Sequence, residues 1–194
     1  MAYRSRTAQE RREAAEARRA RRAAVTEPDA VMEAAAAFLA VRSRSVDETR
    51  KRLVHLGYPA SIVEQVVERL VEIGYLDDEA FARAWVESRD RARPRGAVAL
   101  RRELQRKGVP DDVIGGVLEE RAAAAATHPV EAGVIGDPDR AAAVHLIERR
   151  ASTLRREADP RRRRQKAYAL LARNGFAPDI CHEVASTVVE DQPE

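Results

Sequence analysis

The chain has 194 residues, 44% of them hydrophobic and 35% charged, and its only aromatic residues are three Phe, one Trp and four Tyr. This composition suits several small helical cores better than one large aromatic-rich core. The sequence also excludes a membrane-spanning helix, because no apolar run approaches the ~20 residues that cross a bilayer. The net charge of +3 at pH 7 permits a polyanionic partner without requiring one.

Cysteine usage and the N-terminal sequence both favour a cytoplasmic location. The single Cys181 excludes an internal disulfide, as is usual in a reducing compartment. Because it lies beside Ile180 at an apolar position, we expect it to be a buried small hydrophobe and not a reactive thiol. The N-terminus contains Arg but no signal-type hydrophobic core, so we expect a cytoplasmic protein with no membrane partner.

Residues 1–27 form a basic N-terminal arm, with eight Arg against four Glu and hence a local charge of +4. The segment is rich in Ala and has no apolar stripe to pack against a core. We therefore expect a disordered arm. A tail that contacts nucleic acid and an extension without a role are equally consistent with this composition.

A stretch of fourteen residues occurs three times, at residues 53–66, 104–117 and 171–184. Each copy has a Leu four residues before a Gly, an apolar residue directly after it, a branched aliphatic five residues after it and a Val nine residues after it. The Gly suits the left-handed position that ends a helix, and the apolar residue can fold back over the last turn. Each copy therefore predicts helix, glycine stop and helix, and the shared positions form an internal structural repeat. Its residues are Leu53, Gly57, Ile62, Val66, Leu104, Gly108, Val113, Val117, Leu171, Gly175, Ile180 and Val184.

Local signals divide the chain into three repeats of three helices. In the first repeat (28–74), Ser45 and Glu48 have the form of a capping box for the second helix. The second repeat (75–126) begins with acidic residues suited to a helix start, and we expect its Trp85 to anchor the core and not to stack on bases. Residues 127–138 read as a linker that lets the third repeat (139–190) reorient, and 191–194 form a tail. The predicted fold is all-α, with three tandem three-helix repeats forming an elongated, curved array.

The sequence carries no signature of catalysis. It contains no Walker-type loop, no Gly-x-Ser-x-Gly and no dinucleotide fingerprint. The four His residues lie far apart without paired spacing, and one Cys cannot complete a zinc site with them. We therefore expect a protein that is not an enzyme and that has no catalytic residues, no metal and no cofactor.

The second helix of each repeat and the residues before it are basic, whereas the third helices and the residues after them are acidic. Five positive and two negative residues give 42–52 a charge of +3, and nine against three give 83–107 a charge of +6. Nine against two give 149–166 a charge of +7, whereas 60–80 carries −5. Charged residues that only solvate outer helix faces would explain one repeat, but the threefold recurrence favours a binding surface for a polyanion. Aromatic residues are too scarce for a stacking platform, so no base-specific recognition is indicated. The expected basic face comprises Arg42, Arg44, Arg50, Lys51, Arg89, Arg91, Arg93, Arg95, Arg101, Arg102, Arg106, Lys107, Arg149, Arg150, Arg161, Arg162, Arg163, Arg164 and Lys166.

Four segments resemble the RecX family of regulatory proteins: RSRSVDETRKRLVHLGY, GYLDDEAFARAWVESR, RGAVALRRELQRKGVPDDVI and ARNGFAPDI. The resemblance covers about residues 29 to 190 and leaves the N-terminal arm and the 127–138 linker outside the shared core. It implies three tandem three-helix repeats that bind the filament of the RecA recombinase on DNA. It further implies a monomer that lies in the filament groove and restrains ATP hydrolysis, strand exchange and the co-protease activity in DNA repair and the SOS response.

Two other classes of function remain open from the residues alone. The basic helices also suit a helical-repeat protein that binds single- or double-stranded DNA directly, without sequence specificity and without RecA. They equally suit a structural adaptor for another acidic protein. A RecA modulator should act well below the concentration at which it binds free DNA, whereas an adaptor should leave the RecA ATPase unchanged.

Overall fold

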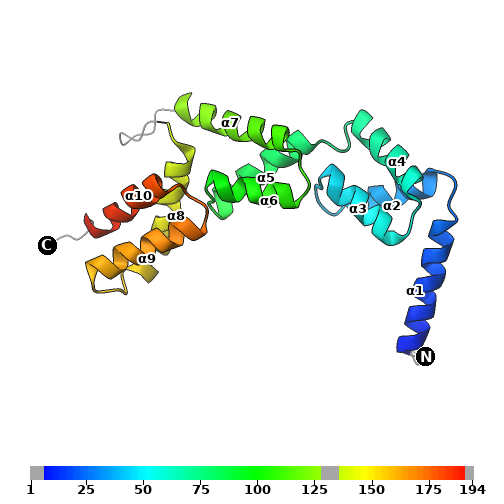
Figure 1. The fold of residues 1–194 in the computed structure, drawn as a ribbon, viewed down its shortest axis with the longest axis horizontal. Helices are drawn as coiled ribbons and strands as arrows, with labels where there is room; N and C mark the ends of the chain where they lie inside the picture. The colour runs from blue at the N-terminus through cyan, green and yellow to red at the C-terminus, as the bar shows by residue number, and fades with distance from the viewer. Residues whose placement is uncertain (1–6, 128–135, 191–194) are drawn as a thin grey trace. The chain divides into compact units, whose positions relative to one another are not determined.

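A computed structural model describes residues 7–127 and 136–190, and this part of the chain contains ten α-helices and no β-strand (Figure 1). The predicted all-α fold is thereby confirmed, while the expected linker falls largely on residues 128–135 and the expected tail on 191–194, both outside the described residues. The helices are α1 (Ala8–Ala23), α2 (Asp29–Leu39), α3 (Val46–Leu56), α4 (Ala60–Glu72), α5 (Asp78–Ala92), α6 (Ala97–Arg106), α7 (Asp111–Thr127), α8 (Pro138–Leu154), α9 (Pro160–Arg173) and α10 (Pro178–Glu190).

Short sequence signals set where these helices begin. The Ser45 side chain accepts a hydrogen bond from the Glu48 N–H, and the Glu48 carboxylate accepts one from the Ser45 N–H, so the predicted capping box starts α3. Asp137 and Asp159 cap α8 and α9 in a simpler way, each followed directly by a proline whose missing N–H is not needed in the first turn.

The repeated Leu–Gly motif ends the second helix of each repeat in the same way. Gly57, Gly108 and Gly175 have φ of 98°, 74° and 81°. The N–H of the residue after each glycine donates to the carbonyl of the motif leucine, at 3.4, 3.2 and 3.4 Å. This is the Schellman bond that satisfies a carbonyl otherwise left open at a helix end.

The leucines of this motif carry the packing. Leu53, Leu104 and Leu171 are each 0% exposed. Complete burial of a leucine removes its whole apolar surface from water, worth roughly 2 kcal/mol before packing effects. In the third helices the residues one position after the branched residue of the motif, Val63, Ile114 and Cys181, are each 0% exposed.

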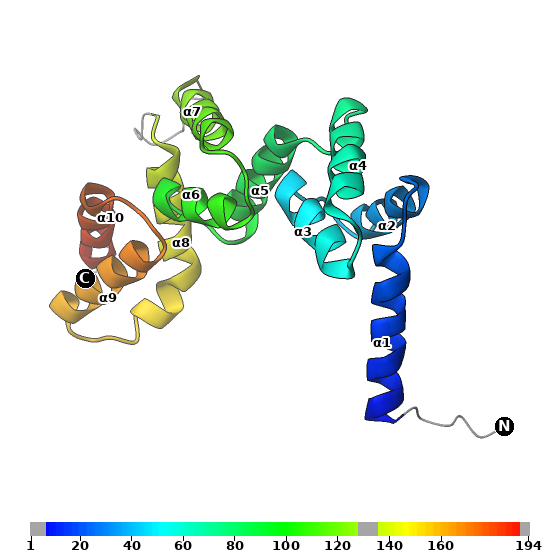
Figure 2. The same cartoon turned by 45° about the vertical axis from the view of Figure 1, so that its right-hand side comes forward.

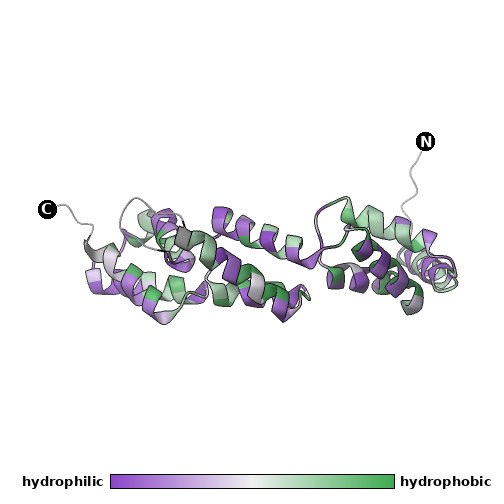
Figure 3. Cartoon of the chain, turned by 90° about the horizontal axis from the view of Figure 1, so that it is seen from above, coloured by the Kyte–Doolittle hydropathy of each residue, from purple (hydrophilic) through white to green (hydrophobic). Residues whose placement is uncertain are grey.

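The chain divides into two compact units, residues 1–81 and 82–194, with the boundary inside α5. In the first unit, α2, α3 and α4 enclose a core that includes Val31, Leu53, Val67 and Leu70. In the second unit, α8, α9 and α10 lie together in two views (Figures 1 and 2) around a core that includes Leu146. Figure 3 shows hydrophobic and hydrophilic residues interspersed along the helices, as amphipathic packing requires.

Helix α1 corrects the expectation of a disordered arm. Thr7 and Glu10 form a reciprocal capping box, and α1 runs from Ala8 to Ala23. The expected lack of an apolar stripe holds, since no residue of α1 is buried and the helix extends away from α2–α4 (Figures 1 and 2). Its last turn is held by polar contact instead, because Arg22 Nη1 donates to the Leu56 carbonyl at 3.3 Å.

Candidate nucleic-acid interface

The basic residues of the first repeat are largely neutralised by neighbouring carboxylates. Arg42 pairs with Glu48 at 3.2 Å, Arg50 with Glu64 at 2.8 Å and Lys51 with Asp47 at 2.7 Å. Such surface pairs contribute little to stability, about 0–1 kcal/mol each, but they lower the net positive field of the helix. The charge of +3 for residues 42–52 already counts Asp47 and Glu48 but not Glu64, so the first repeat offers a polyanion less positive charge than this count.

Arg44 differs from these residues because its guanidinium stacks on an aromatic ring. Its Cζ lies 4.1 Å from the centre of the Phe38 ring, and its Nε is buried without a hydrogen bond. Burial, together with the neighbouring charge of Arg42, lowers the pKa of Arg44 from its ordinary value. Arg44 stabilises the end of α2 through cation–π contact and is only partly available to a ligand.

In the second repeat, one carboxylate organises several of the predicted basic residues. Glu103 accepts hydrogen bonds from Arg89 Nε at 2.6 Å and from Trp85 Nε1 at 2.9 Å, and it lies 3.5 Å from Arg95 Nε. Arg89 and Lys107 lie over the Trp85 ring, at 4.2 and 4.3 Å from its centre. Trp85 is half-buried and is held by charged side chains of α5 and α6, so it does not belong to the buried core in which it was expected.

Other arginines remain exposed, and their side chains make no ion pair or hydrogen bond with any residue that the structure describes. In the second repeat, α5 and α6 present them, and in the third repeat α8 and α9 do. Removing such a side chain leaves no internal carboxylate unpaired, so its charge is available to a partner. From the expected basic face these are Arg91, Arg93, Arg102, Arg106, Arg150, Arg161 and Arg164, and Arg155, Arg156 and Arg173 share these features.

The remaining predicted residues of these repeats are engaged within the chain. Arg101 lies 3.8 Å from Asp111, Arg162 lies 3.6 Å from Asp159, and Lys166 pairs with Glu157. Arg149 is exposed, but it donates to the Ala92 carbonyl at 2.8 Å.

Arg163 requires a correction, since it does not belong to the exposed face. It is 5% exposed, and its Nε donates to the Glu157 carbonyl at 3.0 Å. In α9 the buried positions include Arg163, Ala167 and Leu171, which lie on one face at the four-residue spacing of a helix. The run of four arginines at 161–164 thus divides between the outer surface and the interior, a distinction that local charge counting does not make.

The structure also brings together arginines that are distant in the sequence. Arg93 and Arg95 from the α5–α6 connection and Arg149 and Arg150 from α8 line one open hollow. The backbone of Gly96 donates to the Asn174 carbonyl at 3.1 Å, and Arg95 donates to the Asn174 side-chain oxygen. A Cβ added at Gly96 would stand 2.2 Å from the Gly175 carbonyl oxygen, so this close approach requires glycine.

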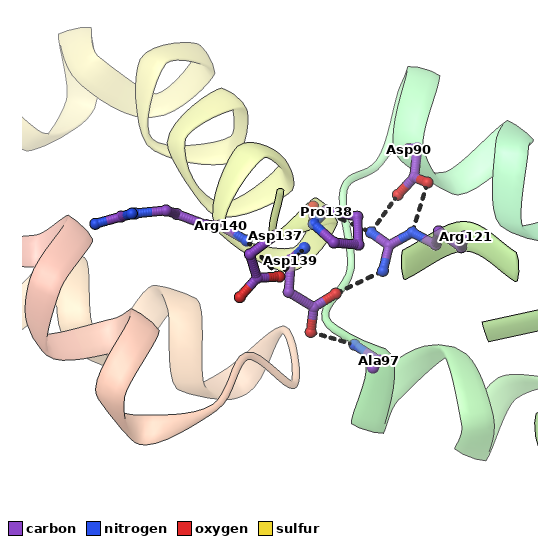
Figure 4. A network of polar contacts seen from close by, with 7 residues as sticks. All are labelled: Asp90, Ala97, Arg121, Asp137, Pro138, Asp139 and Arg140. Carbon is purple, nitrogen blue, oxygen red and sulfur yellow. Dashed lines mark hydrogen bonds and ion pairs between the residues drawn. The ribbon is translucent and has the colours of Figure 1, made fainter. Parts of the chain in front are cut away.

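A buried ion network fixes the second and third repeats to each other (Figure 4). Arg121 of α7 donates two hydrogen bonds to Asp90 of α5, both at 2.9 Å, and one to Asp139 of α8 at 2.6 Å. The second oxygen of Asp139 accepts the N–H of Ala97, the first residue of α6, at 2.7 Å. Burial disfavours the charge of Arg121, but these hydrogen bonds outweigh it and raise its pKa.

This network argues against the expectation that the 127–138 segment lets the third repeat reorient. The Arg121 side chain is 9% exposed and that of Asp139 is 12% exposed, so moving α8 away from α7 would leave buried charges unpaired. None of these network residues was predicted from sequence. The signal that could have found Asp139 is an acidic residue in the first turn of a helix that follows a Gly–Asp–Pro start.

A similar capping contact occurs in the first unit. Asp78, at the start of α5, accepts the N–H of Val46, the first residue of α3, at 2.9 Å. Burial raises the pKa of Asp78, and the hydrogen bond from Val46 only partly offsets this. Asp78 and Asp139 thus play the same part: each comes from the following repeat and accepts an N–H at the start of the second helix of the preceding repeat, α3 and α6 respectively.

The described residues offer little for other classes of site. Within residues 7–127 and 136–190, no group of three or more His, Cys, Asp and Glu is placed to hold a metal ion. None of the helices in this part of the chain has the length and apolar character that a membrane span needs. Cys181 is buried, and burial raises the pKa of its thiol.

Comparison with known proteins identifies the family. The models of the RecX first, second and third three-helix domains match residues 32–70, 77–118 and 137–184. The regulatory protein RecX of Mycolicibacterium smegmatis is 31% identical over 160 residues, which cover 81% of this chain and 78% of that protein. The regulatory protein RecX of Mycobacterium marinum is 33% identical over 147 residues, covering 76% and 78% respectively.

A solved structure supports the fold. The crystal structure of RecX from Lactobacillus salivarius matches with a TM-score of 0.66 at 17% identity, covering 83% of this chain and 96% of that chain. At this identity the match shows a shared fold and nothing finer. Together with the three domain matches and the identity to the mycobacterial proteins, it confirms the resemblance seen in the sequence. The chain belongs to the RecX family of regulatory proteins.

Proposed function

We propose that this protein binds the RecA–DNA filament in the cytoplasm and inhibits its ATPase, strand-exchange and co-protease activities, without being an enzyme itself. The protein would act as a monomer in DNA repair and the SOS response. Membership of a family of regulatory proteins supports the regulatory part of the proposal. The choice of filament and the sign of the effect rest on the family resemblance and on the exposed charge.

The observation that carries the proposal is the set of exposed arginines without internal partners in the second and third repeats. Seven of these side chains belong to the expected basic face, and they lie on α5, α6, α8 and α9 and in the α5–α6 connection. An uncompensated guanidinium gains more from a phosphate than a paired one, because it does not first give up a carboxylate. Binding through phosphates is strongly dependent on salt and insensitive to sequence.

Sequence-independent contact also fits the position of the only Trp. Arg89 and Lys107 lie over the half-buried Trp85 ring and Glu103 accepts its Nε1 hydrogen bond, so the ring already has partners within the chain and is poorly placed to stack on a base. A regulator of a filament that assembles on any DNA sequence needs no base recognition. The basic surface would then track the phosphate backbone or the acidic side chains of the filament.

The test is the rate of ATP hydrolysis by RecA on single-stranded DNA, measured while this protein is added in increasing amounts. We expect the rate to fall at concentrations well below those that saturate free single strands. An unchanged rate, with DNA binding intact, would favour a protein that binds nucleic acid without RecA. An unchanged rate with no DNA binding would favour an adaptor for a different acidic protein. A raised rate would reverse the proposed sign of regulation.

A further inference from the structure

The open hollow between the α5–α6 connection and α8 concentrates positive charge at one place in the second unit. It has a volume of about 510 Å³, and the residues that line it include four arginines. No Asp or Glu is among the lining residues in the part of the chain that the structure describes. The lining is Ala92, Arg93, Pro94, Arg95, Leu146, Arg149, Arg150 and Asn174.

The internal partners of these arginines do not balance their charge. Arg149 and Arg95 donate to neutral oxygens, the Ala92 carbonyl and the Asn174 side chain. The Nε of Arg95 is buried without a hydrogen bond, and its ion-pair partner Glu103 is shared with Arg89.

Arg93 and Arg150 are exposed and have no side-chain partner among the described residues. Four guanidinium groups around one hollow repel each other, so an anion placed there would relieve repulsion as well as gain hydrogen bonds.

We propose that this hollow is a subsite for a backbone phosphodiester of DNA. The proposal rests on the proposed function, because the DNA in question is that of the RecA filament. A guanidinium presents its N–H groups in a planar fork that matches phosphate oxygens. The lining contains no aromatic ring, so the subsite would hold phosphate and not a base. Two repeats contribute the arginines, which makes the subsite depend on how the second and third repeats pack.

The surrounding backbone holds the arginines in place before any ligand arrives. Pro94 is buried between Arg93 and Arg95 and restricts the chain there. The N–H of the following Gly96 donates to the Asn174 carbonyl, and Arg95 donates to the side-chain oxygen of the same Asn174. On the other wall, the bond from Arg149 to Ala92 ties α8 to the end of α5. Such preorganisation reduces the conformational entropy lost on binding.

The test compares two double variants of the full chain that remove the same charge. R93Q/R150Q removes the two unpaired arginines of the hollow. The control R155Q/R156Q removes two exposed arginines just beyond α8, in the same unit, which do not line the hollow. All four side chains are exposed, so both variants should keep the helicity and thermal unfolding of the original chain.

Binding is measured with a labelled single strand of thymidines that lacks a terminal phosphate, across a range of salt. We expect R93Q/R150Q to weaken binding at least about tenfold, since the variant loses the charge-assisted hydrogen bonds of two guanidinium groups. The log–log slope of its salt dependence should fall by about 0.7 for each phosphate that the variant no longer neutralises. The control should weaken binding by less than about threefold, as a loss of general attraction.

Three arms decide the source of the phosphate and the class of partner. A neutral methylphosphonate strand should bind all three proteins equally weakly, and inorganic phosphate should not compete at millimolar concentration. Equal losses in both double variants, tight binding of the neutral strand or displacement by inorganic phosphate would each overturn the subsite. Loss of RecA inhibition with unchanged DNA binding would overturn it in favour of an acidic protein surface. Because wild-type inhibition of RecA is scored separately, failure of the subsite leaves the proposed function standing.

Discussion

Replacing Arg121 with Met should strongly destabilise the second unit. The substitution retains an apolar stem of similar length but removes the guanidinium that bridges Asp90 and Asp139. Removing one partner of a buried ion pair costs about 3–5 kcal/mol, because the other charge is left buried and unpaired. Asp90 is about one-third exposed and can recover water, whereas Asp139 is 12% exposed and cannot. We therefore expect a loss of about 2–4 kcal/mol in the free energy of unfolding.

The assay is urea unfolding followed by circular dichroism at pH 7, with a cycle of R121M, D139N and the double variant. D139N keeps an oxygen for the Ala97 N–H but removes the charge that Arg121 compensates. If the two residues act as one buried pair, the double variant should be more stable than the sum of the single losses predicts, with a coupling of about 1–3 kcal/mol. A loss below about 1 kcal/mol for R121M, or additive single losses, would refute the assignment of this network as the joint between the repeats.

Two further predictions concern glycines at positive φ and the capping residue Asp78. G175A should be the more damaging of two alanine substitutions at positive φ, because its Cβ would meet the Ala99 Cβ at 2.5 Å. The matched G74A has open space and should cost only the about 1–2 kcal/mol of left-handed strain, so equal unfolding free energies would contradict the contact. D78A should lose about 1 kcal/mol through the open Val46 N–H, whereas D78N keeps an acceptor and should be neutral or stabilising at pH 7. Because the pKa of Asp78 is raised in the folded state, the folded protein has its full stability at pH values below the pKa of this carboxyl in the unfolded state. This part of the free energy of unfolding is lost as the pH rises through the higher pKa of the folded state. The advantage of D78N should thus grow with pH in thermal unfolding, and a shrinking advantage would count against a buried carboxylate.

The helices were predictable because their ends depend on neighbouring residues. The Ser45 capping box and the glycine stops at Gly57, Gly108 and Gly175 act within four or five residues, so their outcome can be read along the chain. The capping box of Thr7 and Glu10 is the same kind of signal and predicts α1 as well. The expectation of disorder followed from composition and from the missing apolar stripe alone, and neither of these reports a capping box.

The candidate binding surface was less predictable because ion pairing depends on residues of other helices. Arg50 of α3 meets Glu64 of α4, and Arg89 of α5 meets Glu103 of α6, so a count of charges along the sequence cannot show which arginines stay free. Arg163 lies on the inner face of α9 for the same reason, since only the packing of α8 and α10 decides which face is inner. The position of Arg121 between two aspartates of other helices had no local signal at all.

We propose that exposed, unpaired arginines of the second and third repeats attach this protein to the RecA–DNA filament. The most direct measurement is the affinity of the labelled protein for preformed filaments on single-stranded DNA at several salt concentrations, with R102E/R106E beside wild type. The account predicts that affinity falls steeply with salt and that the charge reversal weakens it at least about tenfold while helicity is unchanged. Affinity that is independent of salt, or equal for the two proteins, would contradict it.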